Sequence, residues 1–152
     1  MKIQTTRFGE IEVEDSQLIT FIKGIPGFEE DKKFVLIPAD EKGESPFFFL
    51  QSIDTADISF VLLDTFSFFK EYDVNLEDSV IEKLEIEKPE DVIVLTTVTV
   101  KGDLERATTN LKAPLVINHH KQLGMQIVLD QKQYMIKQPL FQNSQKAAVG
   151  QV

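Results

Sequence analysis

Histidine, serine and carboxylate side chains are the groups in this sequence that could act in catalysis or bind a metal. The two histidines, His119 and His120, are adjacent in a predicted polar loop, where neighbouring side chains point in different directions. The nearest acid in the sequence is Asp130, across a predicted hairpin. Because a metal site needs three or four convergent ligands, the pair is poorly suited to hold an ion. We interpret it as part of a solvated loop and predict no metal.

The remaining polar groups show no catalytic pattern. None of the 7 serines lies in a G-x-S-x-G motif, and no Lys-Ser or Lys-Thr pair follows Gly24 and Gly27, as a phosphate-binding loop would require. Cysteine is absent, which excludes thiolate nucleophiles and disulfides. With 25 acids, two neighbouring carboxylates can arise by chance, and neither a nucleophile nor a base has an assigned partner. We predict a protein with no catalytic residue, no enzymatic activity and no cofactor.

One segment combines aromatic rings with carboxylates and is our candidate for contact with another protein. Phe68 and Phe69 follow a predicted strand, and Glu71, Tyr72 and Asp73 come directly after them. Aromatic anchors beside a charged rim are typical of protein interfaces. We predict that these five residues bind a partner. A second interpretation stays open, in which the two phenylalanines plug the core beneath a loop.

The charge distribution favours a basic protein partner. The net charge is −9, and residues 71–91 alone carry 9 acids and 2 bases, a net charge of −7. Residues 1–70 carry a net charge of −6, whereas residues 92–152 carry +4. Such a surface repels phosphate groups, so we expect neither direct nucleic-acid binding nor membrane binding. A run of acids is also the ordinary sign of a solvated helix face.

Short strands dominate the elements that must position these residues. The best helix candidate is Asn75–Leu84, in which Asn75 is the expected N-cap and the apolar side chains share one face. Many short strands and one clear helix predict a mainly β protein, a small antiparallel β-barrel-like fold with one or two short helices. The predicted strands are Lys2–Arg7, Glu10–Glu14, Leu18–Ile22, Phe34–Ile37, Phe47–Ile53, Ser59–Leu63, Val92–Val100, Thr108–Leu111, Leu115–Ile117 and Gly124–Leu129, with shorter extended pieces at Glu71–Val74 and Gln133–Ile136.

Three consecutive phenylalanines, Phe47 to Phe49, lie in one of these strands. Because strand side chains alternate between two faces, the three rings cannot all enter one core. We interpret the strand as buried on both faces, with an exposed ring at Phe48 as the alternative.

The length of 152 residues suits one domain with a sizeable core. We predict a single domain over residues 1–138 and a loosely ordered tail over residues 139–152, which Leu140 and Phe141 could dock onto the core. We also see no apolar stretch long enough for a membrane span, no secretory signal and no cysteine. We therefore expect a cytoplasmic protein that is monomeric when free.

Four segments together resemble the flagellar assembly factor FliW family. They are TRFGEIEV at Thr6–Val13, ITFIKGIPGFEE at Ile19–Glu30, PFFFLQSI at Pro46–Ile53 and NLKAPLVIN at Asn110–Asn118, in the family's order. The resemblance runs from about Thr6 to about Tyr134. It implies a small cytoplasmic β-rich regulator without enzymatic activity, whose partners are flagellin and the RNA-binding translational regulator CsrA.

The resemblance further implies a regulatory cycle. The protein binds and antagonises CsrA when flagellin is scarce, and releases it when flagellin accumulates, which couples flagellin synthesis to flagellar assembly. Two other functions stay open from the residues alone. The phenylalanine-rich strands suit a small β-barrel carrier of an apolar ligand. They also suit an OB-like barrel that stacks single-stranded nucleic acid, although the net charge of −9 opposes that function.

Overall fold

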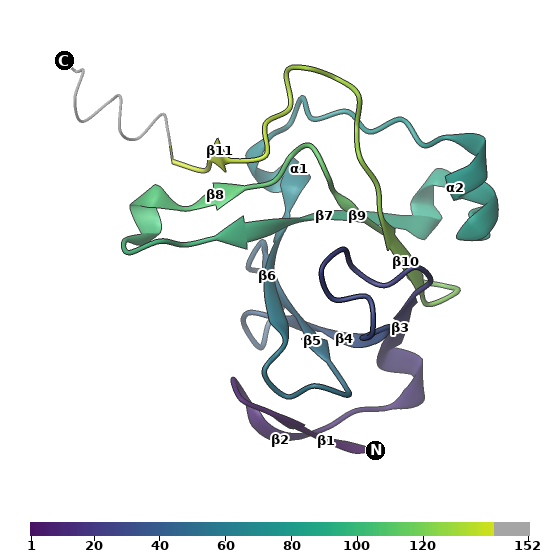
Figure 1. Cartoon of the computed structure of the whole chain (residues 1–152), viewed down its shortest axis with the longest axis vertical. Coiled ribbons are helices and arrows are strands. Elements are labelled where there is room, and N and C mark those ends of the chain that lie inside the picture. Colours follow the sequence, from purple (N-terminus) through teal and green to yellow (C-terminus); the bar gives the residue numbers. More distant parts are fainter. Residues whose placement is uncertain (142–152) are drawn as a thin grey trace.

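The computed structural model describes residues 1–141 and is built around a closed barrel of seven strands (Figure 1). Around the barrel the order is β7, β6, β5, β4, β3, β10 and β9, and β9 pairs back onto β7. Every pairing is antiparallel except β3 with β10. The fold confirms the predicted mainly β, barrel-like architecture. The barrel strands are β3 Leu18–Phe21, β4 Lys33–Pro38, β5 Phe47–Ser52, β6 Ser59–Asp64, β7 Val92–Thr99, β9 Leu115–Asn118 and β10 Leu123–Gln126.

The N-terminal hairpin forms a separate two-stranded sheet on the outside of the barrel wall, next to β4 (Figure 1). Its strands are β1 Lys2–Thr5 and β2 Gly9–Glu12, and the turn closes with Thr5 opposite Gly9, whose φ of +70° suits a residue without a side chain. The buried Ile3 packs with Val13 and with Val35 of β4. The hairpin is therefore held to the barrel by apolar contact.

Two short helices pack on the outside of the barrel wall, on the side away from the hairpin (Figure 1). They are α1 Thr65–Phe68 and α2 Asp78–Lys83. The described residues also contain three single-turn 3₁₀ segments, at Asp15–Gln17, Pro89–Asp91 and Leu104–Arg106. α1 begins directly where β6 ends at Asp64. Among the described residues, no helix has the length and apolar character to cross a bilayer.

The predicted N-cap of the longer helix is wrong. The carbonyl of Glu77 accepts the amides of Val80 and Ile81, at N–O distances of 3.0 and 3.1 Å, so the helix begins after Glu77 and not after Asn75. The extended backbone before Glu77 lets Leu76 pack against the cluster beneath the helix. Burial of that side chain overrides the local capping preference.

A small flap extends from the far end of β7. β8 Thr108–Thr109 pairs with β7, and β11 Gln138–Pro139 pairs with the outer edge of β8. Proline suits that edge position because it cannot donate to a further strand. The extended pieces expected at Gln133–Ile136 and Glu71–Val74 are not strands.

The flap also receives the first residues of the predicted tail. Pro139 pairs with Thr108, Leu140 is buried, and the Phe141 ring lies 5.8 Å from the ring of Phe68. The rest of that prediction, residues 142–152, lies outside the described part of the chain.

The barrel interior is filled by apolar side chains. Its largest members have no exposed surface, and the Phe21 and Phe34 rings pack edge to face with centroids 5.5 Å apart. Each such side chain contributes roughly 1.5–3 kcal/mol by burial. The buried interior cluster comprises Ile19, Phe21, Ile25, Phe34, Leu50, Leu62, Leu95, Leu115 and Ile117. A barrel packed in this way weighs against a carrier that holds its ligand inside.

The three phenylalanines of β5 are covered on both faces of the strand. Phe48 packs against the interior cluster, whereas Phe47 meets Phe68 with ring centroids 6.0 Å apart. Phe49 meets Phe8 at 5.3 Å and lies 4.7 Å beneath the guanidinium carbon of Arg7. All three rings are half-buried, as the two-sided interpretation expects.

Candidate functional site

The five predicted contact residues lie on α1 and the chain that follows it, but they differ in exposure. Glu71 and Asp73 are exposed, Phe68 and Phe69 are half-buried, and Tyr72 is 5% exposed. The segment thus presents its carboxylates to solvent and turns most of its aromatic surface inward. Whether it binds a partner stays a prediction, and the two carboxylates are its accessible part.

Hydrogen bonds fold the start of this segment into a helical turn. The Ser67 hydroxyl donates to the Asp64 carboxylate at 3.1 Å, across the first turn of α1. The buried Thr65 hydroxyl lies 3.0 Å from the hydroxyl of Thr96 on β7. These contacts turn the chain away from β6 and fix α1 against the barrel wall.

The two half-buried phenylalanines belong to the packing under α1. Phe68 contacts Phe47 and Phe141, and its ring centroid is 6.4 Å from that of Phe69. Phe69 lies between the cluster around Leu63 and the cluster around Tyr72. This packing agrees with the core-plugging interpretation for most of both rings.

Tyr72 is a structural member of the segment. Its hydroxyl donates a 2.7 Å hydrogen bond to the buried Leu111 carbonyl, and its ring meets Tyr134 with centroids 4.8 Å apart. Burial raises the pKa of the Tyr72 phenol above its usual value, and the nearby phenol of Tyr134 adds to the rise. The Tyr134 hydroxyl in turn accepts the Asp73 amide at 2.8 Å. These bonds hold the exposed carboxylates of Glu71 and Asp73 on a rigid base.

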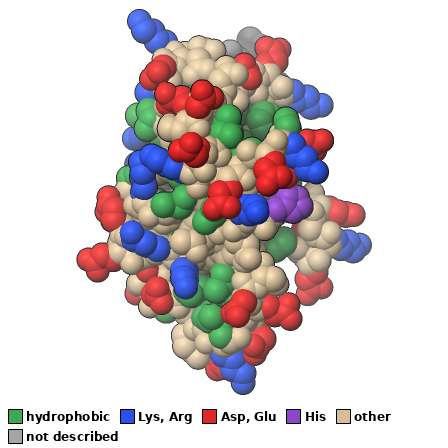
Figure 2. Space-filling view, turned by 90° about the vertical axis from the view of Figure 1, so that its right-hand side faces the viewer, with side chains coloured by type: hydrophobic (Ala, Val, Ile, Leu, Met, Phe, Trp, Pro, Cys, Tyr) green, Lys and Arg blue, Asp and Glu red, His purple; other side chains and the backbone are tan. Residues whose placement is uncertain are grey.

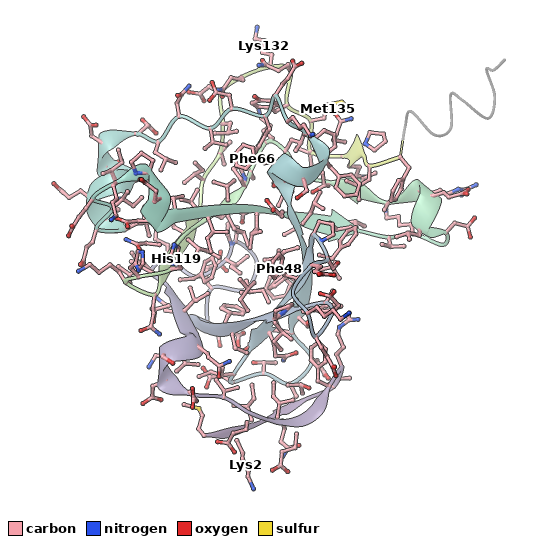
Figure 3. All side chains as sticks on the ribbon, turned by 180° about the vertical axis from the view of Figure 1, so that it is seen from behind. Lys2, Phe48, Phe66, His119, Lys132 and Met135 are labelled. Atoms are coloured by element: carbon pink, nitrogen blue, oxygen red, sulfur yellow. The ribbon has the colours of Figure 1, made fainter. Side chains whose placement is uncertain are left out.

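Phe66 was absent from the predicted patch, yet it is the most exposed aromatic ring in this segment, at 42%. It stands on α1 at the end of the molecule opposite Lys2 of the N-terminal hairpin (Figure 3). The Phe66 ring packs 5.8 Å from Tyr72 on one side and lines a groove on the other. Its place at the second position of α1 explains the exposure, because Thr65 takes the inward position.

The groove beside Phe66, which we call the apolar groove, has a volume of about 460 Å³. Seven of its ten lining residues come from the acidic segment 71–91. On the side of the molecule that carries α2, hydrophobic side chains lie between acidic and basic ones (Figure 2). The lining residues are Phe66, Val74, Leu76, Ile81, Ile86, Glu87, Lys88, Pro89, Val92 and Val94. An apolar floor within an acidic segment can accept an apolar side chain from a basic protein.

Asp91 fixes one lip of the apolar groove. Its buried carboxylate accepts the amides of Glu87 and Lys88 at 3.0 and 3.1 Å. The hydrogen bond from the Glu87 amide is the main cause that lowers the pKa of Asp91, and the amide and charge of Lys88 and the charge of His120 add to it. The loop 87–91 is therefore tied to the end of β7.

The histidine pair contacts Asp91 and not Asp130, the acid nearest in sequence. The His120 Nε2 atom lies 3.6 Å from the Asp91 carboxylate, and the His119 Nε2 atom lies 3.1 Å from the Glu90 carbonyl. Within residues 1–141 no three histidine, cysteine or acidic side chains are grouped as a metal site would need. The contacts give the pair a structural role at the base of the loop 87–91.

Comparison with known proteins assigns the chain to a family. The family model described as FliW protein matches residues 2–140. The flagellar assembly factor FliW of Clostridium novyi (strain NT) is 47% identical, with 93% of this chain and 97% of that protein covered. The FliW of Geobacillus thermodenitrificans (strain NG80-2) is 42% identical, over 93% and 96% of the two chains. A solved crystal structure of the flagellar assembly factor FliW superposes with a TM-score of 0.86 at 41% identity, over 93% of this chain and 97% of that one. The chain therefore belongs to the FliW family of flagellar assembly factors.

Proposed function

We propose that this protein is a non-enzymatic flagellar assembly factor that binds flagellin and the translational regulator CsrA in the cytoplasm. By antagonising CsrA it couples flagellin synthesis to flagellar assembly. The observation that carries the proposal is family membership over residues 2–140. The apolar groove and the exposed carboxylates near it support the proposal, because together they form a surface that a protein partner could contact.

The proposed contact surface consists of Phe66, the apolar groove, Glu71 and Asp73. The exposed ring of Phe66 is a ready anchor, and the carboxylates lie on the chain that leaves the same helix. Phe68, Phe69 and Tyr72 act as its support, because their rings are packed beneath it. Because this support holds the contact surface rigid, less conformational entropy is lost when a partner binds.

Charge explains how such a surface would oppose RNA binding by CsrA. A protein of net charge −9 docked on an RNA-binding regulator places negative potential near the phosphate path. It can therefore weaken RNA binding without covering the RNA site itself. When flagellin occupies the protein, the regulator is released, and the two equilibria are linked.

A matched pair of phenylalanine variants tests the anchor. Phe66 and Phe28 are 42% and 41% exposed, and each packs edgewise or tilted against one other ring. We expect Phe66→Ala to weaken the binding of CsrA or flagellin about tenfold or more, the loss of a typical anchor, while Phe28→Ala has little effect. Isothermal titration calorimetry with each purified partner measures both. Equal effects of the two variants would remove Phe66 from the contact surface.

A second pair of variants tests the carboxylates. Glu71→Lys with Asp73→Lys changes the net charge by four, and so does the control Glu41→Lys with Glu44→Lys in the exposed loop before β5. We expect only the first pair to abolish pull-down of CsrA. If both pairs act alike, general charge and not this surface drives the binding.

Salt provides the third test of the proposal. Binding that depends on acidic steering should weaken as sodium chloride screens the charges, because the screening length falls to about 3 Å at 1 M salt. Calorimetry of the complex with CsrA across a salt series measures the slope. A flat affinity would contradict the electrostatic part and leave the apolar anchor as the alternative.

A further inference from the structure

A second groove lies beside α2, on the edge of the chain that continues from β10. It has a volume of about 490 Å³, and we call it the edge groove. One wall is α2 with the residues just before it, and the other is the chain from Met125 to Gln131. Figure 1 shows this chain rising from β10 past α2. The α2 wall contributes Asn75, Glu77, Ser79, Val80 and Lys83, and Lys23 completes the lining.

The edge arises because β10 runs further than its parallel neighbour. β3 pairs with β10 at only two positions and ends at Phe21. The chain then turns at Gly24, whose φ is +71° and whose amide donates to the Phe21 carbonyl at 2.8 Å. A side chain at Gly24 would lie 2.8 Å from the Glu29 backbone, so the turn is fixed by close packing. The Ile22 amide still donates to the Gly124 carbonyl at 3.2 Å, but after Gly124 no described strand pairs with this side of the chain.

The same chain stays extended through pairing on its other side. The Ile127 amide donates to the Pro114 carbonyl at 3.0 Å, and the Leu129 amide donates to the Lys112 carbonyl at 2.7 Å. Since amides alternate in direction along an extended chain, those of Gln126 and Val128 point toward the open edge. Among residues 1–141, no group accepts a hydrogen bond from either amide. Val128 is also 69% exposed, which leaves a branched apolar side chain beside the open edge.

The charges of the edge groove are separated along its length. Lys23 and Lys83 lie together at the β10 end, where the contact between the two amines lowers the pKa of Lys23. In the described chain neither lysine forms an ion pair. Glu77 directly precedes α2 and Asp130 lies near the end of the exposed edge, so these carboxylates occupy the other end of the groove.

The packing beneath the groove fixes this direction. Val80 and Leu84 of the α2 region share a cluster with Met125, whereas Val74 shares a cluster with Leu129. The wall that contains α2 therefore runs antiparallel to the edge. Its basic end faces Met125, and its acidic end faces Asp130.

We propose that the edge groove binds an extended segment of a partner protein as an added antiparallel strand. The unpaired amides and carbonyls of Gln126 and Val128 supply the backbone contacts, as in other cases of strand addition. For a strand in this direction, the separated charges of the groove select a partner segment that carries a basic residue first and an acidic residue about four positions later. That spacing follows from roughly 13 Å of edge at about 3.3 Å per residue.

This inference goes beyond the proposed function and does not rest on it. The apolar groove favours basic partners, whereas the edge groove selects a segment that carries both charges. The proposals for the two surfaces can therefore be confirmed or refuted independently.

A blocked seven-residue peptide, TKVTVET, tests the proposal against its charge-reversed counterpart of the same composition, TEVTVKT. We expect the first to bind at least about fivefold more tightly, the effect of two exposed charge pairs. Fluorescence anisotropy measures the affinity, and amide shifts in NMR spectra locate the contact at Gln126 and Val128. Equal affinity, no binding or shifts elsewhere would overturn the proposal.

Two variants of the full chain test the charges and the edge. Lys23→Glu with Lys83→Glu should remove the preference between the peptides, while Lys101→Glu with Lys132→Glu, at exposed positions outside the groove, should keep it. Val128→Pro removes one unpaired donor and should weaken binding of TKVTVET several-fold. If that variant does not fold, a TKVTVET peptide with N-methyl groups on the backbone amides that face the edge tests the same hydrogen bonds, and it should bind more weakly than unmethylated TKVTVET.

A second copy of this chain is the competing occupant. Edge-to-edge pairing would appear in analytical ultracentrifugation as a dimer that Val128→Pro converts to monomer. A dimer of that kind, undisturbed by excess peptide, would overturn the proposal in favour of self-association.

Discussion

Replacing Tyr72 by phenylalanine should destabilise the fold and leave partner binding intact. The Tyr72 hydroxyl bonds the Leu111 carbonyl at 2.7 Å, and both residues are at most 5% exposed. Phe would leave that carbonyl unpaired in the core, so we expect the free energy of unfolding to fall by about 1–2 kcal/mol. The control is Tyr134→Phe, whose hydroxyl bonds the Asp73 backbone at an exposed position where water can replace it. There we expect a loss of less than about 0.5 kcal/mol.

Urea unfolding followed by circular dichroism measures the effect of both tyrosine variants. The slope of the unfolding free energy against urea should stay constant, which shows that the same surface is exposed in each case. Binding of CsrA and flagellin is then measured on the folded variants. Equal destabilisation by the two changes would refute the reasoning, and so would a loss of binding by a folded Tyr72→Phe protein.

Three further outcomes follow from the contacts described above. Because burial raises the pKa of Tyr72, unfolded chains release its proton above about pH 10 while folded chains keep it. The free energy of unfolding, measured by urea titration, should therefore fall by up to about 1.4 kcal/mol per pH unit above that pH. The fall should be smaller in the Tyr72→Phe variant. Gly124→Ala places a methyl group 2.9 Å from the Phe21 ring and should lower the free energy of unfolding by about 1–3 kcal/mol, visible as a lower Tm. Because the pKa of Asp91 is lowered in the folded protein, its carboxylate stabilises the fold above its ordinary pKa and stops doing so in acid. The Asp91→Asn variant should therefore be less stable than the unmodified protein at pH 7, and its free energy of unfolding should fall less between pH 5 and pH 2.

Local pattern was enough to predict the seven strands of the barrel but not the way the barrel closes. Runs such as Phe47–Ile53 and Val92–Val100 are rich in aromatic and branched residues, and both are strands in the structure. The parallel pairing of Leu123 with Thr20 joins residues about a hundred positions apart, and no local period encodes it. The helical turn at Thr65–Phe68 was missed for a related reason, since its hydrogen bond to Thr96 is also long-range.

In the candidate site, too, local features could be predicted from the sequence and long-range contacts could not. The exposure of Glu71 and Asp73 follows from their charge, and it was predicted. Tyr72 lies between them and is buried, because the Leu111 carbonyl offers its hydroxyl a partner 39 residues away. The sequence signal for Phe66 was its place among three phenylalanines on one short segment, of which only some can face inward.

The two-residue junction between β3 and β10 has a consequence for synthesis in the cell. The barrel wall is completed only when Leu123 and Gly124 reach Thr20 and Phe21. A ribosome must therefore release the chain at least to Gln126 before the cylinder can shut, and until then the rings of Phe21 and Phe34 lack part of their cover. During most of its translation the nascent protein is therefore an open sheet with exposed apolar side chains, which is prone to aggregation. Rapid completion of the chain or binding of a chaperone to this exposed surface would protect it.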